Sequence, residues 1–391
     1  MILFEEALEI VKQTEFVKAT ERVSFDRSEG RVLAEDIRSD MMMPPFDKSA
    51  VDGYACRRED LGNELELIEV IPAGKAPEKT VGPNQCAKIM TGAPVPEGAD
   101  AVIMVEDTEE TAAGKIRYLK EKVNDNVCYR GEDIQEGAVV LQKGTLIKPQ
   151  HIAVLATVGA VGPLVYKKVK VAVISTGDEL VEPDKKPGIS DIRNSNAYQL
   201  KAQIERMGAI ADYVGIALDN EESTRKMITR AFDGNDMVLL TGGVSMGDYD
   251  FVPKVLNELG VETKFKSIAV QPGRPTVFGT RQRQFIFGLP GNPVSSFVQF
   301  ELLVKPLIYL LTGYDYQPLN LKLPMGETYT RRKSQRLSWL PVQINEHSEV
   351  IPLEYHGSAH INALTVANGL IAIPIGQTQL NKGELVNVRQ I

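Results

Sequence analysis

The chain has 391 residues, of which 43% are hydrophobic and 25% are charged, a composition that indicates a globular protein of roughly two to four domains. Its net charge of −8, without a basic patch, argues against a nucleic-acid partner, and its three widely spaced cysteines argue against a zinc site and a disulfide framework. No signal peptide precedes Glu5 and no apolar run reaches membrane-spanning length, so we expect a soluble protein of the cytoplasm.

The N-terminal part of the chain begins with a predicted amphipathic helix over residues 4–20. Its apolar residues recur near helical spacing: Phe4, Ala7, Leu8, Val11 and Phe16. From residue 23 to about 139 the pattern changes to short β-like runs between Pro- and Gly-rich turns, which predicts a small β-rich domain. The clearest runs are 65–71, 85–90, 101–105 and 115–118. A second helix is predicted at 151–156, and if it packs with the first one, the β-rich region is an insertion into an elongated unit.

Downstream of Lys170, buried strands alternate with helices, a pattern typical of a doubly wound α/β domain that binds ligands at the carboxyl ends of its strands. The predicted strands are 171–175, 212–217, 237–240, 277–278 and 285–287, and the predicted helices are 196–207, 219–232, 251–259 and 293–311. Asp219 and Glu222 have the spacing of a capping box, which favours a structural role for Asp219. After Pro318, β-like runs at 337–344, 370–374 and 384–388 predict a small, barrel-like C-terminal β domain.

Residues 236–251, DMVLLTGGVSMGDYDF, have the pattern of a buried strand, a glycine-rich turn and the start of a helix. The glycines of the turn allow backbone N–H groups to point at a phosphate near the helix start. Asp248 and Asp250 are unsuited to phosphate itself but suit a divalent cation that in turn holds phosphate. The stretch therefore indicates a nucleotide or pyrophosphate site with a metal, and the alternative is a tight turn with solvated acids.

Two further acids, Asp178 and Glu179, directly follow the predicted strand 171–175. If the strands are parallel and adjacent, these side chains lie at the same edge of the sheet as Asp248 and Asp250. Two acidic loops at one edge favour a metal–phosphate site. The alternatives are a helix cap for Asp178 and a plain surface charge for Glu179.

Two rigid turns provide groups for an oxyanion. Arg274, in the turn QPGRP that starts at Gln271, is a fork-shaped donor, although a solvated arginine fits the sequence equally well. Pro293 opens the last helix of the α/β domain, so Asn292 and Ser295 are expected to present polar groups at its N-terminus. Ser295 is not part of a G-x-S-x-G elbow, which argues against a serine hydrolase.

The β-rich half contains its own dense group of polar residues. The stretch PPFDKSAVDGYA, which begins at Pro44, places two acids, a lysine and a serine on constrained backbone. Such a stretch is more often a site than a linker. Two more polar turns, 90–94 and 130–134, lie nearby in the sequence.

Together these stretches resemble the MoeA family, the molybdopterin molybdenumtransferases, which includes the gephyrin E domain. The matching motifs are FDKSAVDGYA from Phe46, IMTGAPVPEGAD from Ile89, RGEDI from Arg130, STGDEL from Ser175, TGGVSMGDYD from Thr241, QPGRP from Gln271 and GLPGNPVSS from Gly288. They stand in the family's order and cover essentially the whole chain, so the resemblance is far more specific than any one motif.

The resemblance implies a transferase, a molybdenum insertase that transfers molybdenum from molybdate to adenylylated molybdopterin. The reaction is expected to need Mg²⁺, to release AMP and to give the molybdenum cofactor. The resemblance also implies a homodimer, in which the α/β domain of one subunit faces the β-rich domain of the other, and contacts with other proteins of molybdenum-cofactor biosynthesis. Two alternatives stay open: a molybdopterin adenylyltransferase, which resembles only the α/β domain, and a non-catalytic scaffold or carrier of molybdopterin.

Site residues follow from the same motifs. The resemblance implies catalytic roles for Asp52, Thr91, Asp133, Glu179 and Asp250, and the four acids among them are expected to hold Mg²⁺. The positions expected to bind the substrate are Asp219, Gly242, Gly243, Ser245, Gly247, Asp248, Arg274, Pro290, Asn292, Pro293 and Ser295. The family often has lysine where this chain has Ser267, Gln271 and Arg274, so the cationic side of the site is thinner and the choice between molybdate and tungstate stays open.

The domain limits are also drawn from the resemblance. We expect an elongated N-terminal helical linker domain made of residues 1–22, 41–53 and 137–167. A β-rich domain of residues 23–40 and 54–136 is inserted into it. The α/β domain, similar to molybdopterin adenylyltransferases, spans 168–315, and the C-terminal β domain spans 316–391.

Overall fold

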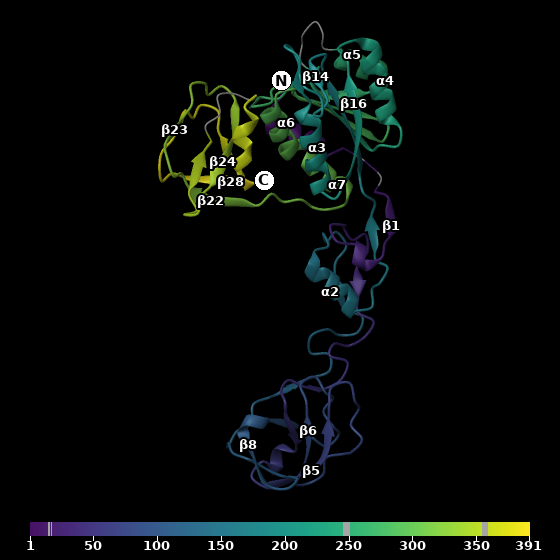
Figure 1. Cartoon of the computed structure of the whole chain (residues 1–391), viewed down its shortest axis with the longest axis vertical. Coiled ribbons are helices and arrows are strands. Elements are labelled where there is room, and N and C mark those ends of the chain that lie inside the picture. The colour runs from purple at the N-terminus through teal and green to yellow at the C-terminus, as the bar shows by residue number, and fades with distance from the viewer. Residues whose placement is uncertain (15, 17, 245–250, 354–358) are drawn as a thin grey trace.

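The computed structural model describes residues 1–391 except 15, 17, 245–250 and 354–358. The molecule is elongated (Figure 1). A β-rich unit forms one end, a small unit around helix α2 forms the middle, and an α/β unit lies beside a C-terminal β unit at the other end.

The α/β unit is built on a six-stranded sheet in the order β16-β13-β17-β21-β20-β18, whose first four strands are parallel. The strands are β13 (Lys170–Thr176), β16 (Ile210–Ala217), β17 (Met237–Thr241), β18 (Glu262–Phe265), β20 (Val277–Arg281) and β21 (Gln284–Leu289). Alternate residues of β13 face opposite sides, because Val171 and Val173 belong to one apolar core and Ala172 and Ile174 to the other. A core on each face confirms the predicted doubly wound arrangement.

Helices cover both faces of this sheet. Helices α4 (Glu221–Phe232) and α5 (Val252–Glu258) pack into one core, and α3 (Ser195–Arg206) packs into the other with the long helix of α6 (Pro293–Gln299), the π-helical segment η4 (Phe300–Val304) and α7 (Lys305–Leu311). This long helix, Pro293–Leu311, has the length and composition to cross a membrane, so the expectation that no apolar run reaches that length is wrong. However, 78% of its most apolar stretch lies buried inside the protein, which is the pattern of a core helix.

The first helix is shorter than predicted, because α1 spans Phe4–Lys12 and its C-cap is Gln13. Its buried face packs into the same core as α3 and the long helix of the α/β unit. Helix α2 (Pro149–Thr157) instead packs into the middle unit. The two helices therefore belong to different cores and the condition that they pack together is not met. Between α1 and α2 in the chain, β1 (Thr20–Arg22) pairs with β12 (Leu164–Tyr166).

The middle unit has a small apolar core of its own. Leu33 and Ile37 pack there with Leu141, Leu155 and Val165. Two strand pairs frame this core: β1 with β12, and β2 (Ile37–Arg38) with β11 (Val139–Leu141). The short helix η1 (Phe25–Arg27) contacts α2. We therefore propose that residues 23–40 belong with the middle unit, and the other domain limits stay as proposed from the sequence.

The β-rich unit contains a six-stranded sheet in the order β7-β4-β6-β5-β9-β8. Its strands are β4 (Gly53–Cys56), β5 (Glu64–Ile71), β6 (Gln85–Ile89), β7 (Ala101–Met104), β8 (Thr108–Ala112) and β9 (Lys115–Tyr118). A separate pair, β3 (Lys48–Ser49) with β10 (Val127–Cys128), and two short helices, η2 (Arg58–Asp60) and η3 (Val105–Asp107), complete it. The four predicted strands in this region are confirmed.

The C-terminal unit is built on a third six-stranded sheet, in the order β19-β24-β26-β28-β22 with β25 beside β24. Its strands are β19 (Val270–Gln271), β22 (Asn320–Pro324), β24 (Leu337–Ile344), β25 (Val350–Pro352), β26 (Gly369–Ile373) and β28 (Leu385–Gln390). The pair β23 (Tyr329–Thr330) and β27 (Gln379–Leu380) packs on the same core, and the short helix η5 spans Ile361–Val366. Strand β19 is contributed by the turn that carries Arg274, so the C-terminal sheet lies directly beside that turn.

Two of the three cysteines face each other inside the β-rich sheet. Cys56 on β4 and Cys86 on β6 are register partners, and both are fully buried. Burial raises the pKa of each thiol to about 12, so neither is a thiolate at pH 8. We expect iodoacetamide at pH 8 to modify one thiol per native chain, the half-buried Cys128, and all three after denaturation. Rapid modification of two or three thiols in the native protein, measured by mass spectrometry, would contradict this burial.

Candidate functional site

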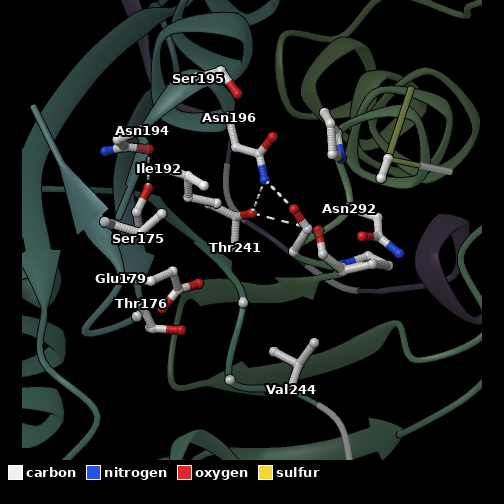
Figure 2. Close-up of a pocket in the computed structure, with 18 of the residues that line it drawn as sticks. Ser175, Thr176, Glu179, Ile192, Asn194, Ser195, Asn196, Thr241, Val244 and Asn292 are labelled. Carbon is white, nitrogen blue, oxygen red and sulfur yellow. Dashed lines mark hydrogen bonds between the residues drawn. The ribbon is translucent and has the colours of Figure 1, made fainter. Parts of the chain in front are cut away.

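The carboxyl ends of β13, β17 and β21 meet at one edge of the α/β sheet and border a cavity of about 730 Å³ (Figure 2). Each strand is followed by a loop that lines it, at residues 177–179, 242–244 and 290–293. The predicted site residues Glu179, Asp219, Gly242, Gly243, Pro290, Asn292 and Pro293 therefore come together here. This is the place that the parallel strand order predicted.

The glycine turn after β17 is shaped by Thr176. Gly242 and Gly243 have φ angles of +91° and +61°, values that favour glycine. A Cβ atom at residue 242 would lie 2.7 Å from the carbonyl oxygen of Thr176, and one at residue 243 would lie 2.8 Å from its hydroxyl. The turn therefore lies directly against the end of β13, as a side-chain-free wall of the cavity.

Two asparagines that sequence reasoning missed organise the rim (Figure 2). Asn194 caps α3, because its side chain accepts from the Ala197 N–H, and it also accepts from the Ser175 hydroxyl at 2.8 Å. Asn196 donates to the Thr241 hydroxyl at 2.9 Å and to the Gly291 carbonyl at 2.7 Å, which joins the start of α3 to the end of β17 and to the loop after β21. The tripeptide Asn-Ser-Asn ahead of a predicted helix was the signal for the cap, but the links to Thr241 and Gly291 were not visible in the sequence.

Two buried polar atoms of this cavity are open to a ligand. The Thr176 hydroxyl belongs to a residue that is only 6% exposed, and it has no hydrogen-bond partner in the described part of the chain. The side-chain oxygen of Asn196, a half-buried residue, is itself buried and likewise has no partner among the described residues. Because unpaired buried polar atoms are costly, both are candidates for contact with a bound molecule.

The acids at this edge have distinct roles. Asp178 and Asp219 bind each other's backbone: the Asp219 N–H donates to the Asp178 carboxylate at 2.9 Å, and the Asp178 N–H donates to the Asp219 carboxylate at 3.3 Å. The predicted capping box is wrong, because Asn220 caps α4 by accepting from the Ser223 N–H. Asp219 instead lines the cavity with the exposed Glu179. The predicted residues Ser245, Gly247, Asp248 and Asp250 lie outside the described residues.

A second cavity of about 950 Å³ adjoins the first and shares Pro275, Pro290 and Asn292 with it. Arg274 and Ser295 line this second cavity. It also receives cationic residues from the C-terminal unit that sequence reasoning missed: Arg331, Arg332, Lys333 and Arg336. The C-terminal unit thus supplies positive charges that the sequence lacks at Ser267 and Gln271. Glu327 is the one acid among the described residues that line this cavity.

These four cationic residues differ in whether their side chains are held by hydrogen bonds within the protein. Arg331 donates to the carbonyl oxygens of Gln377, Arg336 and Pro374, and burial lowers the pKa of its guanidinium. Arg336 donates to the Val270 carbonyl at 3.3 Å. Arg332 and Lys333 are exposed and form no side-chain hydrogen bond or ion pair with the residues that the structure describes, so their charges are available to an anion.

The remaining predicted residues lie in the β-rich unit. One oxygen of Asp52 accepts from both the backbone N–H and the hydroxyl of Thr91, each at 2.7 Å. The Thr91 N–H, followed by its hydroxyl, holds the pKa of Asp52 below the usual value for aspartate, so this exposed carboxylate stays ionised. Asp133 is also exposed, on a neighbouring turn tied to Met43.

Within one chain, the two groups of predicted residues are not brought together. The β-rich unit lies at the far end of the elongated molecule from the α/β sheet (Figure 1), and none of its residues lines either cavity. The described residues contain no cluster of three or more His, Cys, Asp or Glu that could hold a metal. The predicted metal set of Asp52, Asp133, Glu179 and Asp250 therefore stays a prediction for an assembly of chains.

Comparison with known proteins covers nearly all of the sequence. Residues 2–159 match the MoeA N-terminal region (domain I and II), residues 172–309 a probable molybdopterin binding domain, and residues 325–391 the MoeA C-terminal region (domain IV). A molybdopterin molybdenumtransferase of Staphylococcus epidermidis is 36% identical over 97% of this chain and 93% of its own length. One of Staphylococcus aureus is 34% identical over 94% and 90%.

Solved structures give the same result. A molybdopterin biosynthesis MoeA protein from Pyrococcus horikoshii superposes with a TM-score of 0.86 at 30% identity, over all of both chains. A molybdenum cofactor biosynthesis protein from Pyrococcus furiosus, at 20% identity and a TM-score of 0.63, shares the fold.

Proposed function

The chain belongs to the MoeA family, and on that premise we propose that it transfers molybdenum from molybdate to adenylylated molybdopterin and releases AMP. It is a transferase of molybdenum-cofactor biosynthesis, as its curated relatives are named over nearly their whole length. The observation that carries the finer proposal is the pair of adjoining cavities. One has a glycine wall at strand ends, and the other is lined by cations.

The first cavity suits the adenylylated substrate. Gly242 and Gly243 leave the wall free of side chains, so a phosphate group can approach the backbone closely. The Thr176 hydroxyl can donate to such a group, and the Asn196 side-chain oxygen can accept from a ring N–H. We propose that Ser245 and Gly247 complete the phosphate end of this cavity and that Asp248 binds the substrate there through a cation.

The second cavity suits the oxyanion. Molybdate is a dianion, which carboxylates cannot hold without a cation, whereas Arg274, Arg332 and Lys333 can hold it directly. Ser295 adds a hydroxyl near the start of α6. Because Pro275, Pro290 and Asn292 line both cavities, an anion held here lies beside a substrate held in the first cavity.

Mg²⁺ is the cation that the family resemblance implies, and the residues present fit it. Mg²⁺ usually takes one or two carboxylates and completes its shell with substrate phosphates and water. Glu179 and Asp219 line the first cavity and provide that number of carboxylates. We propose that Glu179 holds the ion together with Asp250. When bound, Mg²⁺ neutralises the phosphoanhydride and eases the departure of AMP.

We also propose that the chain works as a homodimer in the cytoplasm. In one chain the cavities lack Asp52, Thr91 and Asp133, which lie on the distant β-rich unit (Figure 1). A second copy, placed with its β-rich unit over the cavity, would add these groups from the opposite side. The exposed, ionised state of Asp52 suits a group that meets its ligand only across such an interface.

Purified protein incubated with adenylylated molybdopterin, molybdate and Mg²⁺ is expected to release AMP and to yield cofactor that reconstitutes an apo-molybdoenzyme. Absence of both products would contradict the proposal. Adenylylation of molybdopterin by ATP with this chain alone would instead support an adenylyltransferase. Tight molybdopterin binding without turnover would support a scaffold or carrier.

The double variant Arg332→Ala with Lys333→Ala is expected to raise the molybdate KM by about tenfold at low salt, because two exposed charges beside the oxyanion are lost. The KM for adenylylated molybdopterin should change little. Lys322→Ala with Lys382→Ala is the matched control, since it removes two exposed charges of the same unit that do not line the cavity. An equal rise of the molybdate KM in the control would show a general effect of net charge and contradict the assignment.

A further inference from the structure

The turn that carries Arg274 is held at three successive carbonyl groups. The side-chain N–H of Gln299 donates to the Pro272 carbonyl at 2.9 Å. The Thr276 hydroxyl donates to the Gly273 carbonyl at 2.7 Å, and two backbone N–H groups donate to the Arg274 carbonyl at 3.0 Å each. Gln299 and Thr276 are both fully buried, so the turn is anchored from the protein interior.

Gln299 is the support that reaches the turn from a different element. It is the last residue of α6, the helix that lines the second cavity through its N-cap Asn292 and through Ser295. Its amide lies so close beneath the turn that a Cβ atom at residue 273 would come 2.5 Å from the Gln299 nitrogen. Gly273, at a φ of +102°, is therefore required both by its backbone conformation and by the closeness of Gln299.

Stability alone does not account for glutamine at this position. The side-chain oxygen of Gln299 is buried and has no hydrogen-bond partner in the described part of the chain. Such an unpaired acceptor destabilises the fold, and an apolar residue of similar length would avoid that cost. What an apolar residue would lose is the single bond to the Pro272 carbonyl.

That bond matters because Arg274 is placed by the backbone of the turn, and Gln299 is the side chain that holds this backbone from another element. Its side chain is exposed and forms no ion pair with any residue that the structure describes. Its position in the cavity is therefore set by the backbone of the turn. We propose that Gln299 is a positioning residue for oxyanion binding, which acts through the Pro272 carbonyl to hold Arg274 at the second cavity. This inference rests on the proposed function, in which that cavity binds molybdate.

Gln299→Met keeps the length and packing of the side chain but removes the donor. We expect the molybdate KM to rise by about tenfold, the effect of one lost buried hydrogen bond on the geometry of the anion site. The KM for adenylylated molybdopterin and kcat at saturating molybdate should change less than twofold, because residue 299 does not line the first cavity. A purely structural role would instead shift both KM values and kcat together.

Gln299→Glu tests the donor itself, because the two side chains have the same shape. The ionised carboxylate repels the Pro272 carbonyl, whereas the protonated acid regains an O–H donor. Burial favours the protonated form, Arg274 on the turn opposes it, and Glu301 on the same helix is already paired with Arg206 and Lys305. The molybdate KM of this variant, divided by that of the wild type at the same pH, should fall as the pH is lowered from 8.5 to 6. The same ratio for Gln299→Met should stay constant.

Gln203→Met is the matched control. Gln203 is also a buried glutamine with one donated hydrogen bond, to the Glu301 carboxylate at 2.9 Å, but it lies on α3 and, among the described residues, forms no hydrogen bond with the turn. We expect it to lower the melting temperature without a selective rise of the molybdate KM. A selective rise in this control as well, or none in Gln299→Met, would overturn the positioning role.

Calorimetric binding of molybdate alone separates this inference from the proposed function. If wild-type protein binds molybdate but releases no AMP, weaker binding by Gln299→Met still supports the positioning role while the proposed reaction is lost. If wild-type protein turns over and Gln299→Met has an unchanged molybdate KM, the positioning role is overturned and the proposed reaction stands. If wild-type protein binds no molybdate at all, both are overturned.

Discussion

Replacing Asp52 with alanine is expected to lower the rate of AMP release by about a thousandfold, the scale on which a charged group at the reacting atoms acts. The carboxylate is exposed in the single chain and is held ionised by the Thr91 N–H and hydroxyl, so its proposed use is to meet Mg²⁺ and phosphate across a dimer interface. Removing the carboxylate leaves the N–H and hydroxyl of the exposed Thr91 without their acceptor, and water can replace it, so the protein should stay folded. Circular dichroism and the melting temperature check this.

Asp52→Asn separates charge from geometry. The asparagine oxygen can still accept from Thr91, so the turn keeps its shape while the negative charge is lost. We expect it to be nearly as inactive as Asp52→Ala. Because the pKa of Asp52 is lowered, its carboxylate stays charged at pH values below the usual titration range of aspartate. If wild-type activity falls with decreasing pH while the pH is still above that range, another group must be responsible. Full activity of Asp52→Asn would remove Asp52 from the metal set.

Gly242→Ala is expected to make the first cavity nearly inactive at substrate concentrations that saturate the wild-type protein. The change combines two penalties: an alanine at a φ of +91°, and a Cβ atom 2.7 Å from the Thr176 carbonyl oxygen. Thr176 cannot yield easily, because β13 is hydrogen-bonded to a strand on each side. We expect a melting temperature several degrees lower and a KM for adenylylated molybdopterin at least about a hundredfold higher, measured by AMP release.

Gly260→Ala provides the control for backbone strain. Gly260 has a similar φ of +80°, but nothing lies within 4 Å of the position of its Cβ atom. It should therefore lose about 1 kcal/mol of stability from the left-handed conformation alone and keep its substrate affinity. If the two variants behave alike, the closeness of Thr176 and the turn has no importance for the site.

The same two inactive variants test the proposed dimer. If Asp52 acts on the cavity of the partner subunit, a mixed dimer of Asp52→Ala and Gly242→Ala chains retains one intact site. Random exchange of subunits then restores about a quarter of wild-type activity, because half of the dimers are mixed and each has one of two sites. If both residues act within one chain, mixing restores nothing.

Most elements of this protein could be inferred from local patterns. The strand at 237–240, the glycine turn after it and the helix at 293–311 were predicted nearly to the residue, because alternation and apolar runs record which side chains are buried. The convergence of Glu179 with Gly242 and Gly243 followed from parallel strand order. The first helix was predicted too long because Phe16 continues the apolar pattern after α1 has ended, and packs on the α/β core from the linker.

Other features depend on contacts between segments that are far apart in the chain. The cap at Asn220 in place of Asp219, and the bridge from Asn196 to Thr241 and Gly291, follow from how loops meet at the sheet edge. The delivery of Arg332 and Lys333 to the cavity of Arg274 follows from the pairing of β19 with β24, which no local periodicity records. The folded chain also places the β-rich unit, which carries Asp52, far from the α/β unit and away from that cavity (Figure 1).

Composition and motifs thus identified the kinds of chemical groups in the site and the family of the chain, because local sequence encodes burial, turns and donor chemistry. They could not say which groups share a cavity, because that is set by strand pairing and by the packing of whole units. Thr176 shows the difference: in the sequence it is one residue of a motif, and in the fold its hydroxyl is buried, unpaired among the described residues and pressed against two glycines. Tertiary packing is what places Thr176 against Gly242 and Gly243, so that the three residues line the first cavity together.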